Sequence, residues 1–267
     1  MDSFESDFNV IHKILKNDEA YTKLIIRKRY SSHYCGYKKI YKKKYGNIYF
    51  VEMLIDALYN NIYVNEIYIA DDIDDYDGFA HGLIRKMIKM RNWKSIYVNT
   101  YSASVLDALS SQQNSNLVRL QLSSINLSGD KFLKLVQNSH FLEYFEANLK
   151  DSECEDRHKI SQAIRESNIK TLIFNNFSIQ HMDLKFMDNI INSKIRNFHL
   201  TSCKFYNEFN LINNYTILNF TVNYICPDYA QNILKRNKQY ILTILLCMNR
   251  KIIPRCVFKS MILNEFI

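Results

Sequence analysis

Apolar residues in the stretch from Leu117 to Leu127 (LVRLQLSSINL) stand at positions one, four, six, nine and eleven. This spacing fits neither a regular helix nor a plain alternating strand, and it indicates a strand that runs into a turn. Ser128, Gly129 and Asp130 then supply turn and cap residues. Apolar residues recur at helical spacing from Phe132 to Val136. The stretch therefore predicts a strand followed by a helix.

The same unit recurs along the chain. Seven strands are predicted to start 22 to 29 residues apart, at Val64, Trp93, Leu117, Leu142, Ile169, Ile195 and Ile217. The first, fourth and sixth positions of all seven units are apolar, whereas hydrophobic residues make up only 47% of the chain. Because each period holds one strand and one helix, we expect a parallel sheet inside and helices outside.

The helices between these strands follow from apolar residues at helical spacing. They are predicted at Phe79–Met90, Ala103–Leu109, Asp130–Val136, Arg157–Ile164, Leu184–Ile191 and Phe205–Leu211. Before the first unit we expect helices at Phe8–Leu15, Glu19–Tyr30 and Asn47–Asn60, and after the last unit at Asp228–Lys238 and Tyr240–Met248. The chain thus divides into a helical N-terminal cap with a basic loop (1–63), seven irregular repeats (64–227) and a helical C-terminal cap (228–267). Caps are needed because an open terminal repeat would expose its apolar interior.

From Val64 to about Pro227 the chain resembles the leucine-rich repeat family, and most of all its ribonuclease-inhibitor-type branch. The best match is IRNFHLTSCKF, Ile195 to Phe205, with Cys203 at the ninth position. The resemblance implies an α/β solenoid, and it implies that Cys203 satisfies backbone groups at the turn. The ninth positions of the other units depart from the family pattern, and they are Asp72, Tyr101, Ile125, Lys150, Phe177 and Ile225. We therefore expect an irregular, shallow horseshoe.

Side chains at the second, third and fifth positions of each unit should point away from the core, onto the concave face of the sheet. Four Lys or Arg and three Glu occupy these positions, so the face is close to neutral. Tyr and Arg concentrate binding energy at protein interfaces. The predicted partner-binding residues are Tyr68, Lys94, Tyr97, Arg119, Tyr144, Lys170, Arg196 and His199. The sequence predicts non-catalytic recognition of a protein partner on this face. The alternative is a solvated face without a partner, or one packed on a neighbouring subunit.

Positive charge is concentrated near the N-terminus. The formal net charge is +8, and residues 1–46 hold eleven Lys or Arg against five Asp or Glu. Residues 37–45 (YKKIYKKKY) interleave tyrosines with Lys38, Lys39, Lys42, Lys43 and Lys44, a mixture that can neutralise phosphates and stack on bases. The alternative functional hypothesis is therefore a nucleic-acid or acidic-surface binder. A basic surface loop whose lysine stems cover apolar groups explains the same residues.

The C-terminal tail is the basis of another hypothesis. Ile253, Pro254, Val257 and Ile262 resemble the start of an F-box, which implies a ubiquitin-ligase adaptor whose repeats select a substrate. The structural interpretation, in which this tail caps the solenoid, is favoured.

Candidate metal and catalytic sites receive little support. The acidic run from Asp71 to Gly78 places Ile73 and Ile84 where an EF-hand needs oxygen ligands. Cys154 and His158 have the spacing of zinc ligands, but no second pair lies nearby. Neither a nucleophile elbow nor a glycine-rich phosphate loop is present. We expect no enzyme, no metal and no cofactor.

The cellular compartment is inferred from features that the sequence lacks. No apolar run is long enough to span a membrane, the first residues are acidic, and the six cysteines form no CxxC pair. These features predict an intracellular, cytoplasmic protein. The abundance of Lys, Asn, Ile and Tyr is typical of AT-rich coding and resembles repeat proteins of protists or large DNA viruses. A viral origin would place the protein in the host cell.

Overall fold

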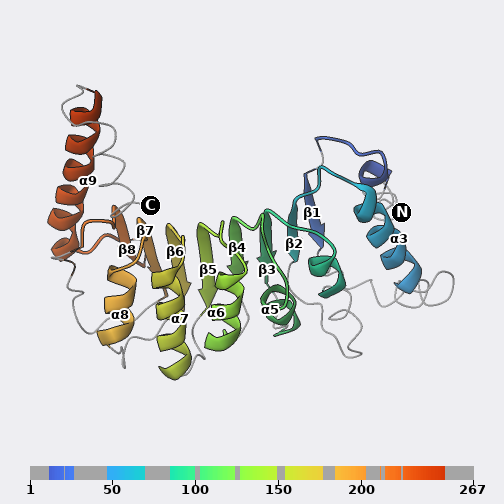
Figure 1. The fold of residues 1–267 in the computed structure, drawn as a ribbon, viewed down its shortest axis with the longest axis horizontal. Helices are drawn as coiled ribbons and strands as arrows, with labels where there is room; N and C mark the ends of the chain where they lie inside the picture. Colours follow the sequence, from blue (N-terminus) through green and yellow to red (C-terminus); the bar gives the residue numbers. More distant parts are fainter. Residues whose placement is uncertain are drawn as a thin grey trace.

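Eight short strands lie side by side in one parallel sheet, in the order in which they occur along the chain (Figure 1). The computed structural model describes residues 12–20, 22–26, 47–69, 85–99, 103–123, 127–148, 154–176, 184–202, 211, 214–223 and 225–249. The strands are β1 (Lys23–Ile26), β2 (Glu66–Ile69), β3 (Ser95–Val98), β4 (Arg119–Leu122), β5 (Tyr144–Asn148), β6 (Thr171–Asn175), β7 (Asn197–Thr201) and β8 (Asn219–Val222). The result is an open, solenoid-like α/β fold.

Helices connect successive strands and form a second layer. They are α3 (Asn47–Asn60), α5 (Ala103–Ser110), α6 (Gly129–Gln137), α7 (Cys154–Glu166), α8 (Leu184–Ile191) and, after the last strand, α9 (Asp228–Asn249). Helices α5 to α8 stand in a row along one side of the sheet, and each packs on the next (Figure 1). Helix α9 lies beyond β8 and projects past the end of the sheet (Figure 1). No helix within the described ranges is long and apolar enough to cross a membrane.

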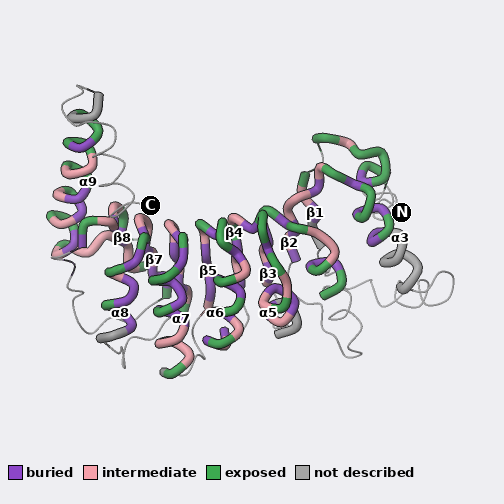
Figure 2. The backbone as a smooth tube through the Cα atoms, in the orientation of Figure 1, coloured by how far each residue is buried: buried purple, intermediate pink, exposed green. Residues whose placement is uncertain are grey.

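The sheet places the predicted apolar positions in continuous buried rows. One row runs from Leu24 across all eight strands through Ile67, Ile96, Leu120, Phe145, Leu172, Phe198 and Phe220. Of the twenty-one first, fourth and sixth positions, all but Val222 are buried, and Val222 is half-buried on the last strand. Figure 2 shows how buried and more exposed residues alternate along these elements. The parallel sheet predicted from the apolar spacing is therefore confirmed.

Most of the predicted helices are present. Helices α3 and α8 have the predicted bounds, and α5, α6 and α7 contain the predicted segments and extend them by one to three residues at one or both ends. Of the segment predicted as helix from Phe79 to Met90, residues 85–89 are helical, and 79–84 lie outside the described residues. The segment 12–15 is helical as predicted, whereas the first residues of that helix and most of the one predicted near Phe205 lie outside the described ranges.

Two predictions of terminal elements are wrong. Residues 23–26 form strand β1 rather than part of a helix, and β1 pairs in parallel with β2. The β-branched pair Ile25 and Ile26 favours a strand, and the edge of β2 offers backbone partners that a helix would leave unused. The segment assigned to the N-terminal cap therefore contributes a strand to the sheet. At the other end, the two predicted helices are one continuous helix, α9, because no helix breaker separates Lys238 from Tyr240.

Buried polar side chains line most of the corners at which the chain returns to the next strand. These residues are Asn61, Asn114, Ser139, Ser167, Ser193, Asn214 and Asn237. The Asn214 side chain accepts a hydrogen bond from the Ile217 N–H at 2.8 Å and donates to the Ile191 carbonyl at 2.6 Å. The hydroxyls of Ser167 and Ser193 likewise accept from the N–H two residues later. These bonds satisfy backbone groups that the turn would otherwise leave buried without partners.

Ser139 differs from the other corner serines and allows a test of this role. Its buried hydroxyl oxygen has no hydrogen-bond partner among the described residues, whereas Ser193 donates to Ile190 and accepts from Ile195. We expect Ser193→Ala to lower the free energy of unfolding by about 1 kcal/mol. Ser139→Ala should leave the free energy of unfolding unchanged or raise it, because the substitution removes a hydroxyl that is buried without a hydrogen bond. Urea unfolding of the two variants measures the difference, and equal losses would contradict this role of the corner residues.

Candidate functional site

Five of the eight residues predicted to bind a partner lie on one face of the sheet, opposite the buried rows. Tyr68, Tyr97, Arg119, Tyr144 and His199 are on strands β2, β3, β4, β5 and β7. Lys94, Lys170 and Arg196 each precede a strand by one residue. We call this surface the open face. Its two central rows, which run from Lys23 to Asn219 and from Tyr68 to Thr221, are exposed or half-buried except at Ser95.

Lysine and tyrosine side chains form a cluster at the N-terminal end of the open face. The Lys23 Nζ atom lies 5.4 Å from the centre of the Tyr68 ring and 5.2 Å from the centre of the Tyr97 ring. The centres of the two rings are 6.0 Å apart, and the rings are tilted by 34°. A cation within about 6 Å of an aromatic ring is attracted by the ring electrons. Lys23 thus links three strands, although it reaches the site from β1.

A second cation–aromatic pair continues the cluster toward β5. The guanidinium carbon of Arg119 lies 4.5 Å from the centre of the Tyr144 ring. The Tyr144 hydroxyl donates a hydrogen bond to the Glu146 carboxylate at 2.7 Å. Burial raises the pKa of Tyr144, and the bond to Glu146 raises it further, so this hydroxyl keeps its proton and remains a donor.

The small side chain of Ser95 allows the larger groups to approach one another. Ser95 is in register with Glu66 on one side and Arg119 on the other. Although it belongs to the open face, it is only 1% exposed. Its neighbours therefore cover it. We name the surface formed by Lys23, Tyr68, Tyr97, Arg119 and Tyr144, on five adjacent strands, the aromatic–cation cluster.

The C-terminal part of the open face has a different chemistry. Asn219 donates to Asn197, which donates to Thr171, and His199 Nδ1 lies 2.8 Å from the Thr221 hydroxyl. Burial lowers the pKa of His199, which favours its neutral imidazole. These polar groups already have partners within the sheet, so a ligand would have to replace existing hydrogen bonds.

Between the two parts, the remaining polar groups are also engaged. Asn175 donates to Glu146 at 2.9 Å, and the Thr201 hydroxyl donates to Asn175. Lys170 forms an ion pair with Glu143 at 2.8 Å. Arg196 is half-buried before β7. The structure thus brings Tyr68, Tyr97, Arg119 and Tyr144 together and places His199 in the other, polar part of the face. Lys170 and Arg196 precede the strands β6 and β7 of that part.

On the aromatic–cation side, the cations contact aromatic rings but form no ion pair with the carboxylates that the structure describes. Among the described residues, Lys23, Lys94 and Arg119 have no carboxylate within ion-pair distance. Glu66 is likewise unpaired in these parts of the chain. Within the described ranges, three cations and one carboxylate therefore have no ion-pair partner that an external ligand would have to replace. Sequence reasoning missed Lys23, because its segment was interpreted as helix.

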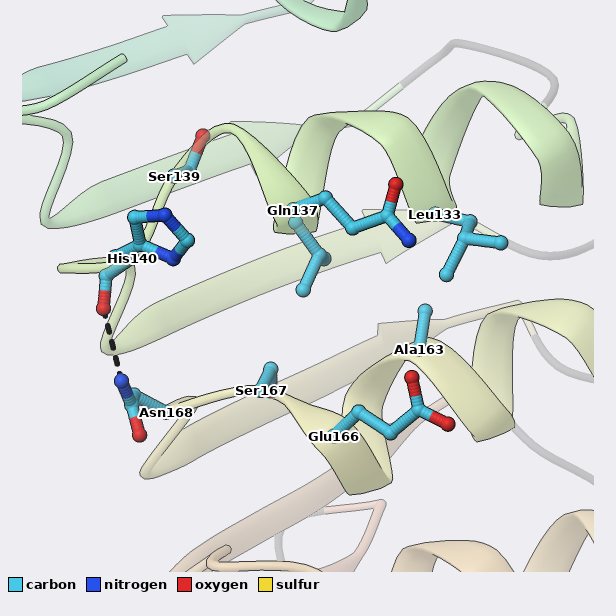
Figure 3. Close-up of a pocket in the computed structure, with 9 residues that line it drawn as sticks. Leu133, Gln137, Ser139, His140, Ala163, Glu166, Ser167 and Asn168 are labelled. Atoms are coloured by element: carbon cyan, nitrogen blue, oxygen red, sulfur yellow. Dashed lines mark hydrogen bonds between the residues drawn. The ribbon is translucent and has the colours of Figure 1, made fainter. Parts of the chain in front are cut away.

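A cavity of about 180 Å³ lies on the other layer, between α6 and α7. His140, Glu166, Asn168 and Gln137 contribute its polar lining, and the Asn168 side chain donates to the His140 carbonyl across one end (Figure 3). The Ser139 hydroxyl points away from the space between the two helices (Figure 3). His140 and Glu166 are exposed to solvent. We regard this cavity as a gap between neighbouring repeats and not as a ligand site.

Several predicted features lie outside the described residues. They are the basic loop with Lys38, Lys39, Lys42, Lys43 and Lys44, the acidic run from Asp71 to Gly78, Cys203 and the tail after Asn249. Within the described parts of the chain, no group of three or more His, Cys, Asp or Glu side chains could hold a metal ion. Comparison with protein-family models finds no match to this chain, and comparison with curated proteins finds none either.

Proposed function

We propose that the protein is a non-catalytic recognition module that binds a protein partner on the open face of its sheet. We also propose that its strand–helix units are irregular leucine-rich repeats. The apolar first, fourth and sixth positions, the parallel strands and the row of helices support the second proposal. They do not bear on the partner, because a repeat scaffold serves many functions.

The aromatic–cation cluster carries the functional proposal. Tyrosine and arginine contribute large contact areas and strong hydrogen bonds, and residues of these types dominate the binding energy of many interfaces. Here Tyr97, Arg119 and Tyr144 occur on adjacent strands of a rigid sheet. Because the strands fix their spacing, little conformational entropy is lost when a partner binds. The cluster is therefore suited to a specific protein contact.

The balance of charge favours a protein partner over nucleic acid. On the strands themselves, the open face carries Lys23 and Arg119 as cations and Glu66 and Glu146 as carboxylates. Nucleic-acid affinity arises mainly from the neutralisation of phosphates by Lys and Arg. A face that also carries carboxylates neutralises phosphates poorly. A protein surface with mixed charge is the better complement.

Capture of the partner with a matched control tests the proposal. We expect Tyr97→Ala combined with Arg119→Ala and Tyr144→Ala to weaken binding of the purified partner at least about 100-fold, because all three substitutions remove contacts at the centre of the cluster. The control variant combines Tyr59→Ala, Lys134→Ala and Phe141→Ala, which are exposed side chains outside the strands. Isothermal titration calorimetry measures the affinity of each variant for the partner. A larger loss in the control than in the open-face variant would refute the proposed function.

A further inference from the structure

We infer that the partner presents an acidic, extended segment to the aromatic–cation cluster and to Lys94 beside it. This inference rests on the proposed function and adds the chemistry of the partner. It follows from the contrast between the two ends of the open face. At the polar end, side chains bond to one another, whereas Lys23, Lys94 and Arg119 have no carboxylate partner among the described residues.

Arg119 is the centre of the proposed site. Its guanidinium lies over the Tyr144 ring, which is itself held by a hydrogen bond to Glu146. Contact with the ring restrains the guanidinium while its N–H groups stay free to donate. Arg119 is exposed. A restrained arginine of this kind can bind a carboxylate through two parallel hydrogen bonds, and little rotamer entropy remains to be lost.

Lys23 provides a second anchoring charge at a defined place. Its ammonium group is positioned near both Tyr68 and Tyr97. The aromatic rings lower its exposure to water without neutralising its charge, so a carboxylate that approaches it gains more than it would from a free surface lysine. Lys94, which precedes β3 and is exposed, adds a third positive charge between β2 and β4.

The spacing of these charges favours an extended segment over a single phosphate. Lys23 and Arg119 occupy the same row on β1 and β4, three strand spacings apart. At the usual distance between strands this corresponds to about 14 Å between their backbones. The Lys23 side chain leans toward β3, which shortens the distance between the charges. An extended chain advances roughly 3.3 Å per residue, so acidic side chains two to four residues apart would reach both cations.

Separate cations are a poor match for one phosphate group, which needs several donors around a single point. They match carboxylates that are distributed along a peptide. Tyr68 and Tyr97 lie between the cations and offer flat, half-buried rings against which apolar or aromatic residues of the same segment could pack. We therefore expect acidic residues interspersed with apolar or aromatic ones.

Selection from a library of random dodecapeptides, with the full-length chain as bait, tests this inference. We expect retained peptides to be enriched in Asp and Glu spaced two to four residues apart, and their binding to weaken as salt is raised. The variant Lys94→Gln with Arg119→Gln should bind them about 10- to 100-fold more weakly. Its matched control is Lys89→Gln with Lys134→Gln, two exposed lysines on the helix layer. Circular dichroism checks that both variants are folded.

The outcomes separate this inference from the proposed function. Peptides that lose binding to the Tyr97, Arg119 and Tyr144 triple variant, but carry no excess of acidic residues, would overturn the inference and leave the proposed function standing. A library with no peptide that depends on the open face would also overturn the inference, and partner capture would then decide the proposed function alone. Tighter binding of a twelve-nucleotide oligothymidylate through Lys94 and Arg119 would overturn both.

Discussion

Replacing Phe145 with alanine should lower the free energy of unfolding by about 3–5 kcal/mol. Phe145 is fully buried on β5, and its ring centre lies 4.6 Å from that of Phe132 on α6 and 6.5 Å from that of Phe174 on β6. It therefore joins the helix layer to the sheet and one strand to the next. The substitution removes these contacts and leaves a cavity that the rigid rows of the sheet cannot close. Because domains of this kind are stabilised by roughly 5–15 kcal/mol, a large share of the stability depends on this ring.

Phe141 provides the matched control for this substitution. It lies four residues earlier in the chain but is 63% exposed. Phe141→Ala should change the free energy of unfolding by less than about 1 kcal/mol, because it removes little buried surface. Urea or thermal unfolding, followed by circular dichroism, compares the two variants. Similar losses for both would mean that the register placing Phe145 inside the structure is wrong.

Asn61→Ala should have the second-largest effect, about 2–4 kcal/mol. The Asn61 side chain, 3% exposed, accepts hydrogen bonds from the N–H groups of Tyr63 and Val64 at 2.9 and 2.7 Å and donates to the Ile14 carbonyl at 2.9 Å. Alanine would leave these backbone groups buried without partners. It would also release the helical turn that contains Ile14, which packs in the core.

The neighbouring Asn60 is the control for this prediction. It has the same side chain, ends α3 and is exposed. We expect Asn60→Ala to be within about 0.5 kcal/mol of the wild type. Hydrogen exchange adds a local measurement, because Asn61→Ala should increase exchange at the N–H groups of Tyr63 and Val64. Unchanged stability of Asn61→Ala would show that water or other groups replace its hydrogen bonds.

The strands and their register were predictable because each unit repeats one physical requirement. A parallel strand covered by a helix must bury alternate side chains, and this places apolar residues at fixed positions such as Ile96, Leu120 and Phe145. Repetition makes the signal stronger than any single strand would. β1 escaped prediction because its four residues also fit helical spacing, and only the edge of β2 decides between the two.

The polar corner residues have a signal in the sequence that differs from the one expected at the turns. Asn or Ser occurs two or three residues before the first apolar position of most units, as Asn61, Asn114, Ser193 and Asn214 illustrate. The family resemblance places its polar residue at the ninth position of a unit, after the strand. The corner residues instead precede the strand. The physical requirement, satisfaction of buried backbone groups, is the same at both corners.

The composition of the open face was predictable, but its internal contacts were not. Alternation along a strand determines that Tyr97 and Arg119 share a face. It does not determine that Lys23 reaches across β2, that Ser95 is covered, or that His199 is engaged with Thr221. These contacts depend on side-chain rotamers and on neighbours from strands far apart in the sequence. The division of the face into an aromatic–cation end and a self-bonded polar end therefore needed the structure.

Hydroxyl-radical footprinting of the protein with and without its purified partner tests the central claim most directly. Radical labelling of aromatic side chains reports their exposure, and the chain carries exposed aromatics elsewhere, at Tyr59, Phe141 and Tyr215, as internal references. Binding to the open face should reduce labelling of Tyr68, Tyr97 and Tyr144 and leave the three references unchanged. Protection of Tyr59, Phe141 or Tyr215, with no change at the three open-face tyrosines, would contradict binding of the partner on the open face.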